Sequence, residues 1–214
     1  MQVLITGANR GIGAQLAADY DARGDGVWAT SRDGSTGFAL DVTQPKAHRA
    51  LADSLEGQPL DLLICNAGVY LDKGQRIDDG FAPALWDASF AANVTGVFLT
   101  IQSLLPNLRA ARAAKIAIIS SQMGSDTRAP GGSYIYRASK AAVLNLGRNL
   151  STDLKGDGIA VGIYHPGWVR TDMGSAAAEI SVEEASAGLI ARFDALSMAT
   201  TGCFETWDGR AHPF

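Results

Sequence analysis

The segment Val3-Leu-Ile-Thr-Gly-Ala-Asn-Arg-Gly-Ile-Gly13 decides the fold of this chain. Its apolar start, residues 3–6, is typical of a buried strand, and an apolar rhythm at helical spacing follows over residues 12–23. Glycines at positions 7, 11 and 13 let the backbone turn tightly and approach a ligand closely. The amino end of the helix then offers free N–H groups and a positive dipole end to a pyrophosphate. The order of strand, glycine turn and helix therefore indicates a dinucleotide site, with a plain glycine turn as the alternative.

The rest of the chain repeats this alternation of short apolar runs with helical patterns. Strands are expected at residues 3–6, 27–30, 37–41, 60–65, 115–120, 159–164 and 202–206. Helices are expected at residues 12–23, 45–55, 83–113, 135–154 and 182–196, the third with a break around Asn93. Such alternation is typical of a parallel sheet with helices on both faces, and right-handed crossovers favour a doubly wound arrangement. Because no linker or repeat divides the sequence, we expect an α/β chain with a single Rossmann-type domain, residues 1–214, and about seven strands.

Composition narrows the classes of partner. Lys and Arg total 18 against 22 Asp and Glu, a net charge of -4 that predicts no nucleic-acid or anionic-membrane partner. No apolar run is expected to be long enough to span a bilayer. Cys65 and Cys203 lack metal-ligand spacing and form no disulfide framework, so we expect no metal site and a reducing compartment. With no charged and apolar leader ahead of Gln2, the cytoplasm is the expected location.

The end of the second expected strand bears on the choice of cofactor. A site that selects the unphosphorylated dinucleotide usually places an acidic residue there, on the ribose 2′-OH. Here Ser31 and Arg32 occupy the strand end, and Asp33 comes one position later. Arg32, helped by Arg10 of the glycine turn, could hold a 2′-phosphate through charge-assisted bonds. We therefore expect NADP(H), with NAD(H) as the alternative; the two arginines could also be ordinary solvated residues.

Three further segments follow strands or begin a helix, where a ligand would lie. Tyr136 and Lys140 are four residues apart in an expected helix, so the phenol and the ammonium share one face. A nearby ammonium favours the ionised phenol, which makes the pair a candidate general acid and base for a carbonyl or an alcohol. Ser120 and Ser121 end the fifth strand and could supply a donor to a carbonyl oxygen. The turn Asn66-Ala-Gly68 suits a backbone that approaches a ligand or a neighbouring element.

Taken in this order, the segments resemble the short-chain dehydrogenase/reductase family from Thr6 to about Met173. The resemblance is carried by Thr6–Gly13 (Thr-Gly-x-x-x-Gly-x-Gly), Asn66–Gly68 (Asn-Ala-Gly), Asn93, Tyr136–Lys140 (Tyr-x-x-x-Lys) and Pro166–Thr171 (Pro-Gly-x-x-x-Thr). Residues 134–140 and 165–173 look most similar to the C-factor and sniffer-like carbonyl reductases. The glycine spacing differs from the Gly-x-Gly-x-x-Gly of the general dinucleotide fingerprint.

The resemblance implies hydride transfer between NADP(H) and a carbonyl or a secondary alcohol. Tyr136 would give a proton to the substrate oxygen, and Ser121 would orient that oxygen. Lys140 would hold the nicotinamide ribose and favour the tyrosinate, and Asn93 would support a water in a proton relay. The implied cofactor contacts are Gly7, Asn9, Arg10, Gly11, Ile12, Gly13, Ser31, Arg32, Asp41, Val42, Asn66, Ala67, Gly68, Tyr136, Lys140, Pro166, Gly167, Val169 and Thr171. Among these, Asp41 and Val42 would lie at the adenine and Thr171 at the carboxamide.

Some segments depart from the family pattern. Ser121 lies farther before Tyr136 than is usual, so Ser120 and Ser125 are rival candidates for the active serine. The stretch between the second and third strands is too short for a helix, which would leave the adenosine pocket open. Residues 172–181, which would cover the substrate, are few and rich in alanine, so the site is expected to be exposed.

Two functions follow as hypotheses. The first is an NADP(H)-dependent carbonyl reductase, and the alternative is an NADP(H)-binding signalling or regulatory protein of the C-factor type with little turnover. Trp168 follows the sixth strand and is a candidate wall of the substrate site, whereas His165 is expected to make structural hydrogen bonds. Trp86 and Trp207 are expected in the core or in subunit contacts. The family implies a homo-oligomer, a dimer or a tetramer, through the helices that begin at Asn93 and Ile135.

Overall fold

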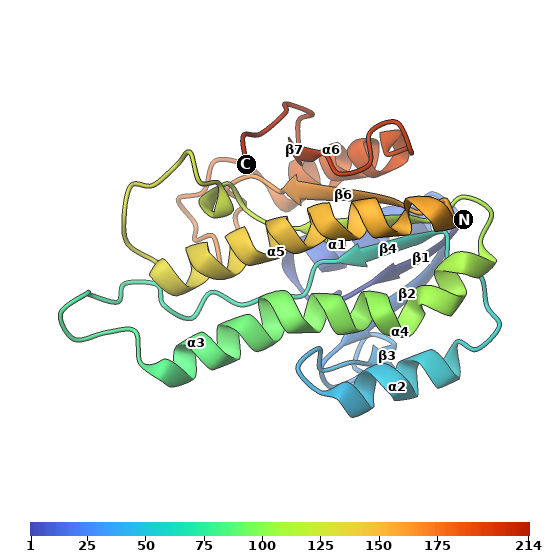
Figure 1. Cartoon of the computed structure of the whole chain (residues 1–214), viewed down its shortest axis with the longest axis horizontal. Helices are drawn as coiled ribbons and strands as arrows, with labels where there is room; N and C mark the ends of the chain where they lie inside the picture. Colours follow the sequence, from blue (N-terminus) through green and yellow to red (C-terminus); the bar gives the residue numbers. More distant parts are fainter.

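A seven-stranded parallel sheet runs through the centre of the computed structural model, which describes residues 1–214 (Figure 1). The strand order is β3-β2-β1-β4-β5-β6-β7, and every neighbouring pair is parallel. The strands are β1 (Gln2–Ile5), β2 (Gly26–Ser31), β3 (Phe38–Ala39), β4 (Leu62–Cys65), β5 (Lys115–Ile119), β6 (Ala160–His165) and β7 (Phe204–Thr206). This order reverses direction between β1 and β4, which creates a crevice at the carboxyl edge where ligands bind in such sheets.

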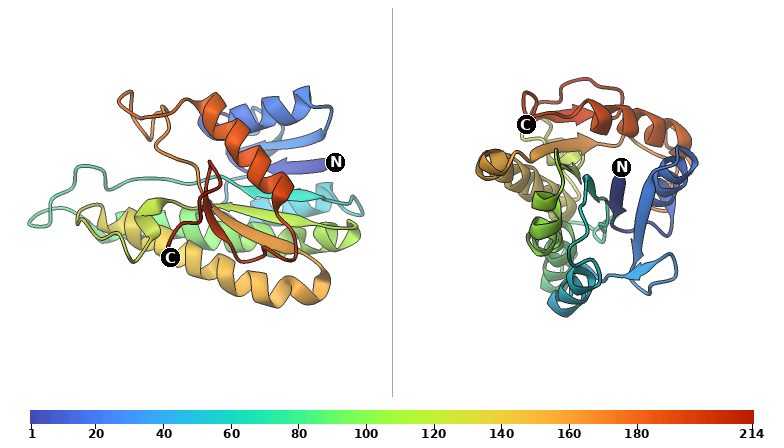
Figure 2. Two further views of the ribbon diagram at one scale, coloured as in Figure 1. Left: turned by 90° about the horizontal axis from the view of Figure 1, so that it is seen from above. Right: turned by 90° about the vertical axis from the view of Figure 1, so that its right-hand side faces the viewer.

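Helices cover both faces of the sheet, as the alternating pattern predicts (Figure 2). The helical elements are α1 (Gly11–Ala22), α2 (Pro45–Ser54), α3 (Pro83–Phe90), the π-helical turn η1 (Ala91–Thr95), α4 (Gly96–Ala110), the 3-10 turns η2 (Gln122–Gly124) and η3 (Leu154–Asp157), α5 (Tyr134–Asp153) and α6 (Val182–Ala195). The predicted break around Asn93 is therefore a π turn inside one continuous helix rather than a gap. The predicted strand 37–41 shortens to Phe38–Ala39, and no helix joins β2 to β3, as expected.

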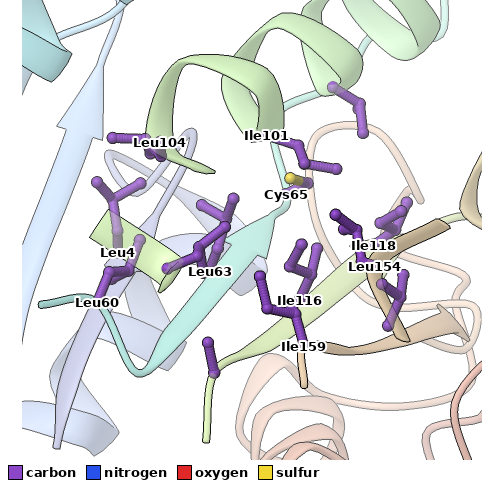
Figure 3. Packing of buried hydrophobic residues seen from close by; sticks show 14 of the residues in the cluster. Leu4, Leu60, Leu63, Cys65, Ile101, Leu104, Ile116, Ile118, Leu154 and Ile159 are labelled. Atoms are coloured by element: carbon purple, nitrogen blue, oxygen red, sulfur yellow. The ribbon is translucent and has the colours of Figure 1, made fainter. Parts of the chain in front are cut away.

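Two hydrophobic layers result because successive strand residues point to opposite faces. On one face Leu4 and Leu63 pack with Ile101 and Leu104 of α4 and with residues of α2 and α5 (Figure 3). On the other face, residues of β1, β4 and β5 pack with Leu16 of α1 and with residues of α6. The central strands are thus buried on both sides, which holds their carboxyl ends at fixed positions for a site.

One helical segment corrects a sequence expectation. Pro83–Ala110, which joins α3, η1 and α4, is 28 residues long with a mean hydropathy of 1.4 in its most apolar window, so by length and composition it could cross a bilayer. We expected no such run. In this fold 44% of that window is buried, and Ile101, Leu104 and Leu108 belong to the core. The apolar character of the segment is accounted for by its packing against the sheet.

Candidate active site

The glycine turn and the turn after β4 are bound to each other by side-chain hydrogen bonds. Thr6 Oγ1 accepts from the backbone N–H groups of Asn66 and Ala67, each at 3.0 Å. Asn66 Nδ2 donates to the carbonyl oxygens of Thr6 and Gly7, also at 3.0 Å. A Cβ at Gly13 would lie 2.3 Å from the Gly7 oxygen, and Gly7 has φ of +67°, so both positions require glycine. The backbone N–H groups that open α1 therefore border an open crevice.

That crevice is a cavity of about 790 Å³ at the carboxyl edge of the sheet. Most residues implied as cofactor contacts line it: Gly7, Asn9, Arg10, Gly11, Ile12, Gly13, Arg32, Asp41, Val42, Asn66, Ala67, Gly68, Tyr136, Lys140, Pro166 and Thr171. Ser31, Gly167 and Val169 do not line it, and Ser31 and Val169 are buried. Segments that are far apart in the sequence thus meet at one cleft.

Two arginines, Arg10 and Arg32, line the cleft, and only one of them forms an ion pair. Arg32 is exposed and makes no hydrogen bond or ion pair within the chain, whereas Arg10 pairs with Asp172 at 2.9 Å across the mouth of the cleft. Both side chains of that pair are mostly exposed, so the pair contributes little to stability and is easily exchanged. Asp33 also lines the cleft, and hydrogen bonds from Ser35 and Ser31 lower the pKa of its carboxyl to about 2. An anion here would find Arg32 free, with Asp33 as its negative neighbour.

Asp41 lies farther along the same wall. Its Oδ1 accepts from the backbone N–H of Thr43 at 2.9 Å and from the Thr43 hydroxyl at 2.7 Å. Partial burial works against the charged carboxyl, but the bonds from Thr43 prevail and lower the pKa of Asp41. The carboxylate is therefore held in one orientation, as a fixed acceptor on the cleft wall.

Tyr136 lies on the first turn of α5 and is only 8% exposed. Burial raises the pKa of its phenol to about 12, and Tyr70 and Asp72 add to the increase, whereas the Ser121 hydroxyl acts against it. The Tyr70 ring stacks on the Tyr136 ring, with centroids 4.3 Å apart and planes 21° from parallel. The phenol is thus held in a defined place and carries its proton at neutral pH.

The three candidate serines differ in what they contact. Ser120 Oγ donates to the Lys140 carbonyl at 3.0 Å, and Ser125 Oγ donates to the Phe214 carbonyl at 3.2 Å. Ser121 Oγ accepts from the Met123 N–H at 3.1 Å, and the Ser121 hydroxyl acts to lower the pKa of the Tyr136 phenol. Of the three serines, only Ser121 affects the pKa of the phenol, whereas only Ser120 lines the 790 Å³ cavity.

Lys140 differs from the expectation drawn from its spacing. Its Nζ lies 5.7 Å from the centre of the Tyr136 ring and donates to the Ile119 carbonyl at 2.9 Å. Burial lowers the pKa of the ammonium to about 8. The helical spacing predicts that Lys140 favours the ionised phenol, but in this geometry burial dominates and the pKa of Tyr136 rises instead. The sequence alone does not reveal this effect, because desolvation is a property of the packed site.

Asn93 lies on the π turn η1 and is buried. Its Oδ1 accepts from the Val69 N–H at 2.8 Å, while its Nδ2 donates to the Val69 carbonyl and to Ser139 Oγ, both at 2.9 Å. Both N–H donors of the side chain are therefore used in joining the segment after β4 to α5. A π turn widens the helix locally and is frequent at functional sites.

Two residues of the site escape sequence analysis. Asp72 is 0% exposed, and its carboxylate accepts from the backbone N–H groups of Ile135 at 2.8 Å and of Tyr136 at 3.2 Å. Asp72 thus takes the place of an N-cap side chain by accepting from backbone N–H groups at the start of α5, because the N-cap residue Ser133 makes no such bond. Tyr70 adds the ring stack and a hydroxyl contact with Ser133. No local pattern links residues 70–72 to a helix some sixty positions later.

Trp168 lies away from the main cleft. It is 44% exposed, its Nε1 donates to the Gly174 carbonyl at 2.6 Å, and it lines a second cavity together with His165, Gly167 and Trp207. The imidazole of His165 makes no hydrogen bond within the chain, contrary to the structural role expected for it. Trp86 is half-buried and stacks on Phe90 in α3.

The comparisons with known proteins agree with this geometry. The sequence model of the short chain dehydrogenase family matches residues 1–180. The chain is 34% identical to "C-signal" of Myxococcus xanthus, over 78% of this chain and 99% of that protein. It is 35% identical to 1-hydroxy-2-glutathionyl-2-methyl-3-butene dehydrogenase of Rhodococcus sp. (strain AD45), over 97% of this chain and 96% of that protein.

Two solved structures are similar over the whole chain. One is the NADPH-bound carbonyl reductase from chicken fatty liver, with a TM-score of 0.91, 31% identity, and 100% of this chain and 98% of that one covered. The other is the carbonyl reductase Sniffer of D. melanogaster, with a TM-score of 0.94, 26% identity and coverage of 100% and 99%. The fold of the whole chain is thus shared with carbonyl reductases.

Proposed function

Because the chain belongs to the short-chain dehydrogenase family, we propose that it is an NADP(H)-dependent carbonyl reductase in which Tyr136 is the general acid and base. The observation that carries this proposal is the placement of Tyr136 and Lys140 on the wall of a cleft at the carboxyl edge of the sheet, with the Ser121 hydroxyl acting on the phenol. A protein that only binds a nucleotide gains nothing from a buried, proton-bearing phenol in contact with a hydroxyl. The substrate class is a ketone or an aldehyde, or in reverse a secondary alcohol.

The cleft fits a dinucleotide on its own features. The glycine turn leaves no room for side chains, and the N-terminus of α1 opens onto the cavity, as a pyrophosphate requires. Arg32 has no partner within the chain and would pair with a 2′-phosphate, while Asp41 would accept from the adenine. Lys140 would bind the nicotinamide ribose, and Thr171 would contact the carboxamide. The bound cofactor would supply the hydride.

The chain's own residues would supply proton transfer and orientation. The carbonyl oxygen would lie between the Ser121 hydroxyl and the Tyr136 phenol and would accept a hydrogen bond from each. As negative charge develops on that oxygen, the phenol would give up its proton. Ser121 would stabilise the same charge without losing its proton. Asn93 would act through the π turn, by holding the segment that carries Val69 and Tyr70 against α5.

The alternative function is that of a signalling or regulatory protein that binds NADP(H) with little turnover. The similarity to "C-signal" of Myxococcus xanthus favours it. The two functions separate in one assay: NADPH consumption measured with a broad panel of ketones and aldehydes, and product identification for every hit. Reduction of any carbonyl to its alcohol with matching NADPH loss supports the reductase. Tight NADPH binding without any product supports the alternative.

We also propose a homo-oligomer that uses α4 and α5. Phe98 of α4 and Tyr134 of α5 are 38% and 41% exposed, and contact with a second copy of the chain would cover them. Sedimentation of the purified protein would give a mass above that of one 22.4 kDa chain. A single-chain mass at all concentrations would contradict this proposal.

A further inference from the structure

The second cavity, of about 580 Å³, lies beside the proposed catalytic residues. Gln122, which follows Ser121 directly, forms part of its wall. Gly167 and Trp168, which follow Pro166 of the main cleft, form another part. The ends of the neighbouring parallel strands β5 and β6 contribute residues to both cavities: Ser120 and Pro166 line the first, and Gln122, His165 and Gly167 line the second. A substrate whose carbonyl contacts Ser121 therefore has this space within reach of its far end.

Basic side chains dominate the polar part of this cavity. Arg128 and Arg210 line it with His165 and His212, and Glu179 is the acidic lining residue. Arg210 is paired with Asp208 at 2.8 Å. Arg128 has no carboxylate partner: its guanidinium donates to the neutral Gln122 amide. One full positive charge is therefore available to a ligand in this cavity.

His165 supplies a second, independent sign of a ligand. His165 is only 8% exposed and lines the cavity, and its Nδ1 has no hydrogen-bond partner. An unpartnered buried polar group is costly, and such groups are normally satisfied by another protein group, an ordered water or a ligand. Burial lowers the pKa of this imidazole to about 4, and His212 and Arg128 lower it further than Asp208 raises it. The field at His165 is thus positive and suits an acceptor.

Aromatic side chains form another part of the wall. Trp168 and Trp207 supply aromatic surface, and a Cβ at Gly167 would lie 2.5 Å from Ile180 and 2.9 Å from the Trp207 ring. The last residues return along β7, where the His212 N–H donates to the Phe204 carbonyl at 2.8 Å and Ser125 donates to Phe214 (Figures 1 and 2). The cavity thus combines an apolar wall with a cationic end.

We infer that this second cavity binds the carboxylate of a carbonyl substrate, with the substrate's apolar stem against Trp168 and its carboxylate on Arg128. The inference rests on the proposed reductase function, because it assigns the far end of that reaction's substrate. A planar guanidinium pairs with a carboxylate through two parallel hydrogen bonds. Glu179 also lines the cavity, and its negative charge would repel the carboxylate. Removing the charge of Arg128 should therefore weaken binding of the carboxylate, and removing that of Glu179 should strengthen it.

The test compares keto acids of increasing chain length with their methyl esters, in the presence of NADPH. For the chain length that spans the two cavities, we expect kcat/KM for the acid to exceed that for its ester by about tenfold or more, mostly through KM. Arg128→Gln would remove the preference and leave the ester unchanged, and Glu179→Gln would increase it. Arg112→Gln, an exposed arginine at the opposite end of the sheet, is the matched control and would keep the preference. Equal values for acid and ester in the native protein, unchanged in Arg128→Gln, would overturn the inference.

A binding measurement separates this inference from the proposed function. The ring signals of His165 in the NMR spectrum would shift when the same keto acid is added to the protein with NADP⁺, and would not shift in Arg128→Gln. If no carbonyl compound is reduced but this shift occurs, the reductase proposal fails and the carboxylate site stands. If reduction occurs without acid preference and without the shift, the reductase stands and the carboxylate site is wrong.

Discussion

The carboxylate of Asp72 accepts a hydrogen bond from the backbone N–H of Tyr136 at 3.2 Å, and another from Ile135 at 2.8 Å. A residue just after β4 thereby fixes the first turn of the helix that carries the proposed acid. The negative charge also lies at the positive end of α5, where it stabilises the helix. The position of Tyr136 is therefore set from outside its own helix.

Replacing that carboxylate tests its positioning role. Asp72→Asn keeps the size of the side chain, but its NH2 group would face one of the two backbone N–H groups that the carboxylate binds, and that N–H would lose its acceptor. We therefore expect the free energy of unfolding to fall by about 1–3 kcal/mol. Displacement of the phenol would lower kcat by about tenfold to a hundredfold. The assay is kcat per NADPH-binding site, with the NADPH dissociation constant unchanged. A variant with native kcat per binding site would show that Asp72 stabilises the fold without placing Tyr136.

The stack between Tyr70 and Tyr136 gives a graded prediction. Tyr70→Phe keeps the ring and loses the contact with Ser133, whereas Tyr70→Leu loses the ring as well. Since such ring pairs contribute about 0.5–1.5 kcal/mol, we expect the leucine variant to lose several-fold more kcat than the phenylalanine variant. Steady-state kinetics of both with one ketone decides the matter. Equal losses would place the effect in the hydroxyl and not in the ring.

The buried ammonium of Lys140 predicts a stability that depends on pH. The pKa of Lys140 is about 8 when folded and has its ordinary value of 10.5 when unfolded, so between these values the unfolded chain holds the extra proton. Stability from this group therefore rises from pH 8 toward 10.5 and carries its full penalty below pH 8. Lys140→Met removes the penalty and the bond to Ile119, for a net gain of about 2 kcal/mol at pH 7.

Urea unfolding of both proteins at pH 7 and near pH 10 checks this. The advantage of the methionine variant should shrink at the higher pH, although the variant should be inactive. An advantage that stays constant across this range would mean that the ammonium is not buried as the structure has it.

Cofactor choice depends on Arg32. Arg32→Ala is expected to raise the NADPH dissociation constant by about tenfold to a hundredfold, because one charge-assisted contact with the 2′-phosphate is lost, and to leave NADH binding nearly unchanged. Calorimetric titration with both cofactors measures this, with Arg112→Ala as the control. Parallel losses for NADPH and NADH would assign Arg32 to the shared part of the dinucleotide.

Much of the fold is readable from local patterns. The run of residues 3–13 predicts a strand, a glycine turn and a helix, and all three form. The glycine requirement and the hydrophobic periodicity are both set by residues close together in the sequence, so they can be read from it. The irregularity at Asn93 is likewise predicted, although its π geometry is not. Local patterns fail where a contact joins distant segments, as between Asp72 and Tyr136, or where burial sets a pKa, as at Lys140. Trp168 shows the same limit, since its place after β6 does not tell which cavity it lines.

The most direct test of the account is Tyr136→Phe, assayed for NADPH binding and for carbonyl reduction in the same preparation. The phenylalanine keeps the ring stacked on Tyr70 and removes only the hydroxyl that would give up the proton. We expect an NADPH dissociation constant close to native and a fall in kcat of about a hundredfold to ten-thousandfold. Native turnover in this variant would contradict the assignment of Tyr136 as the acid.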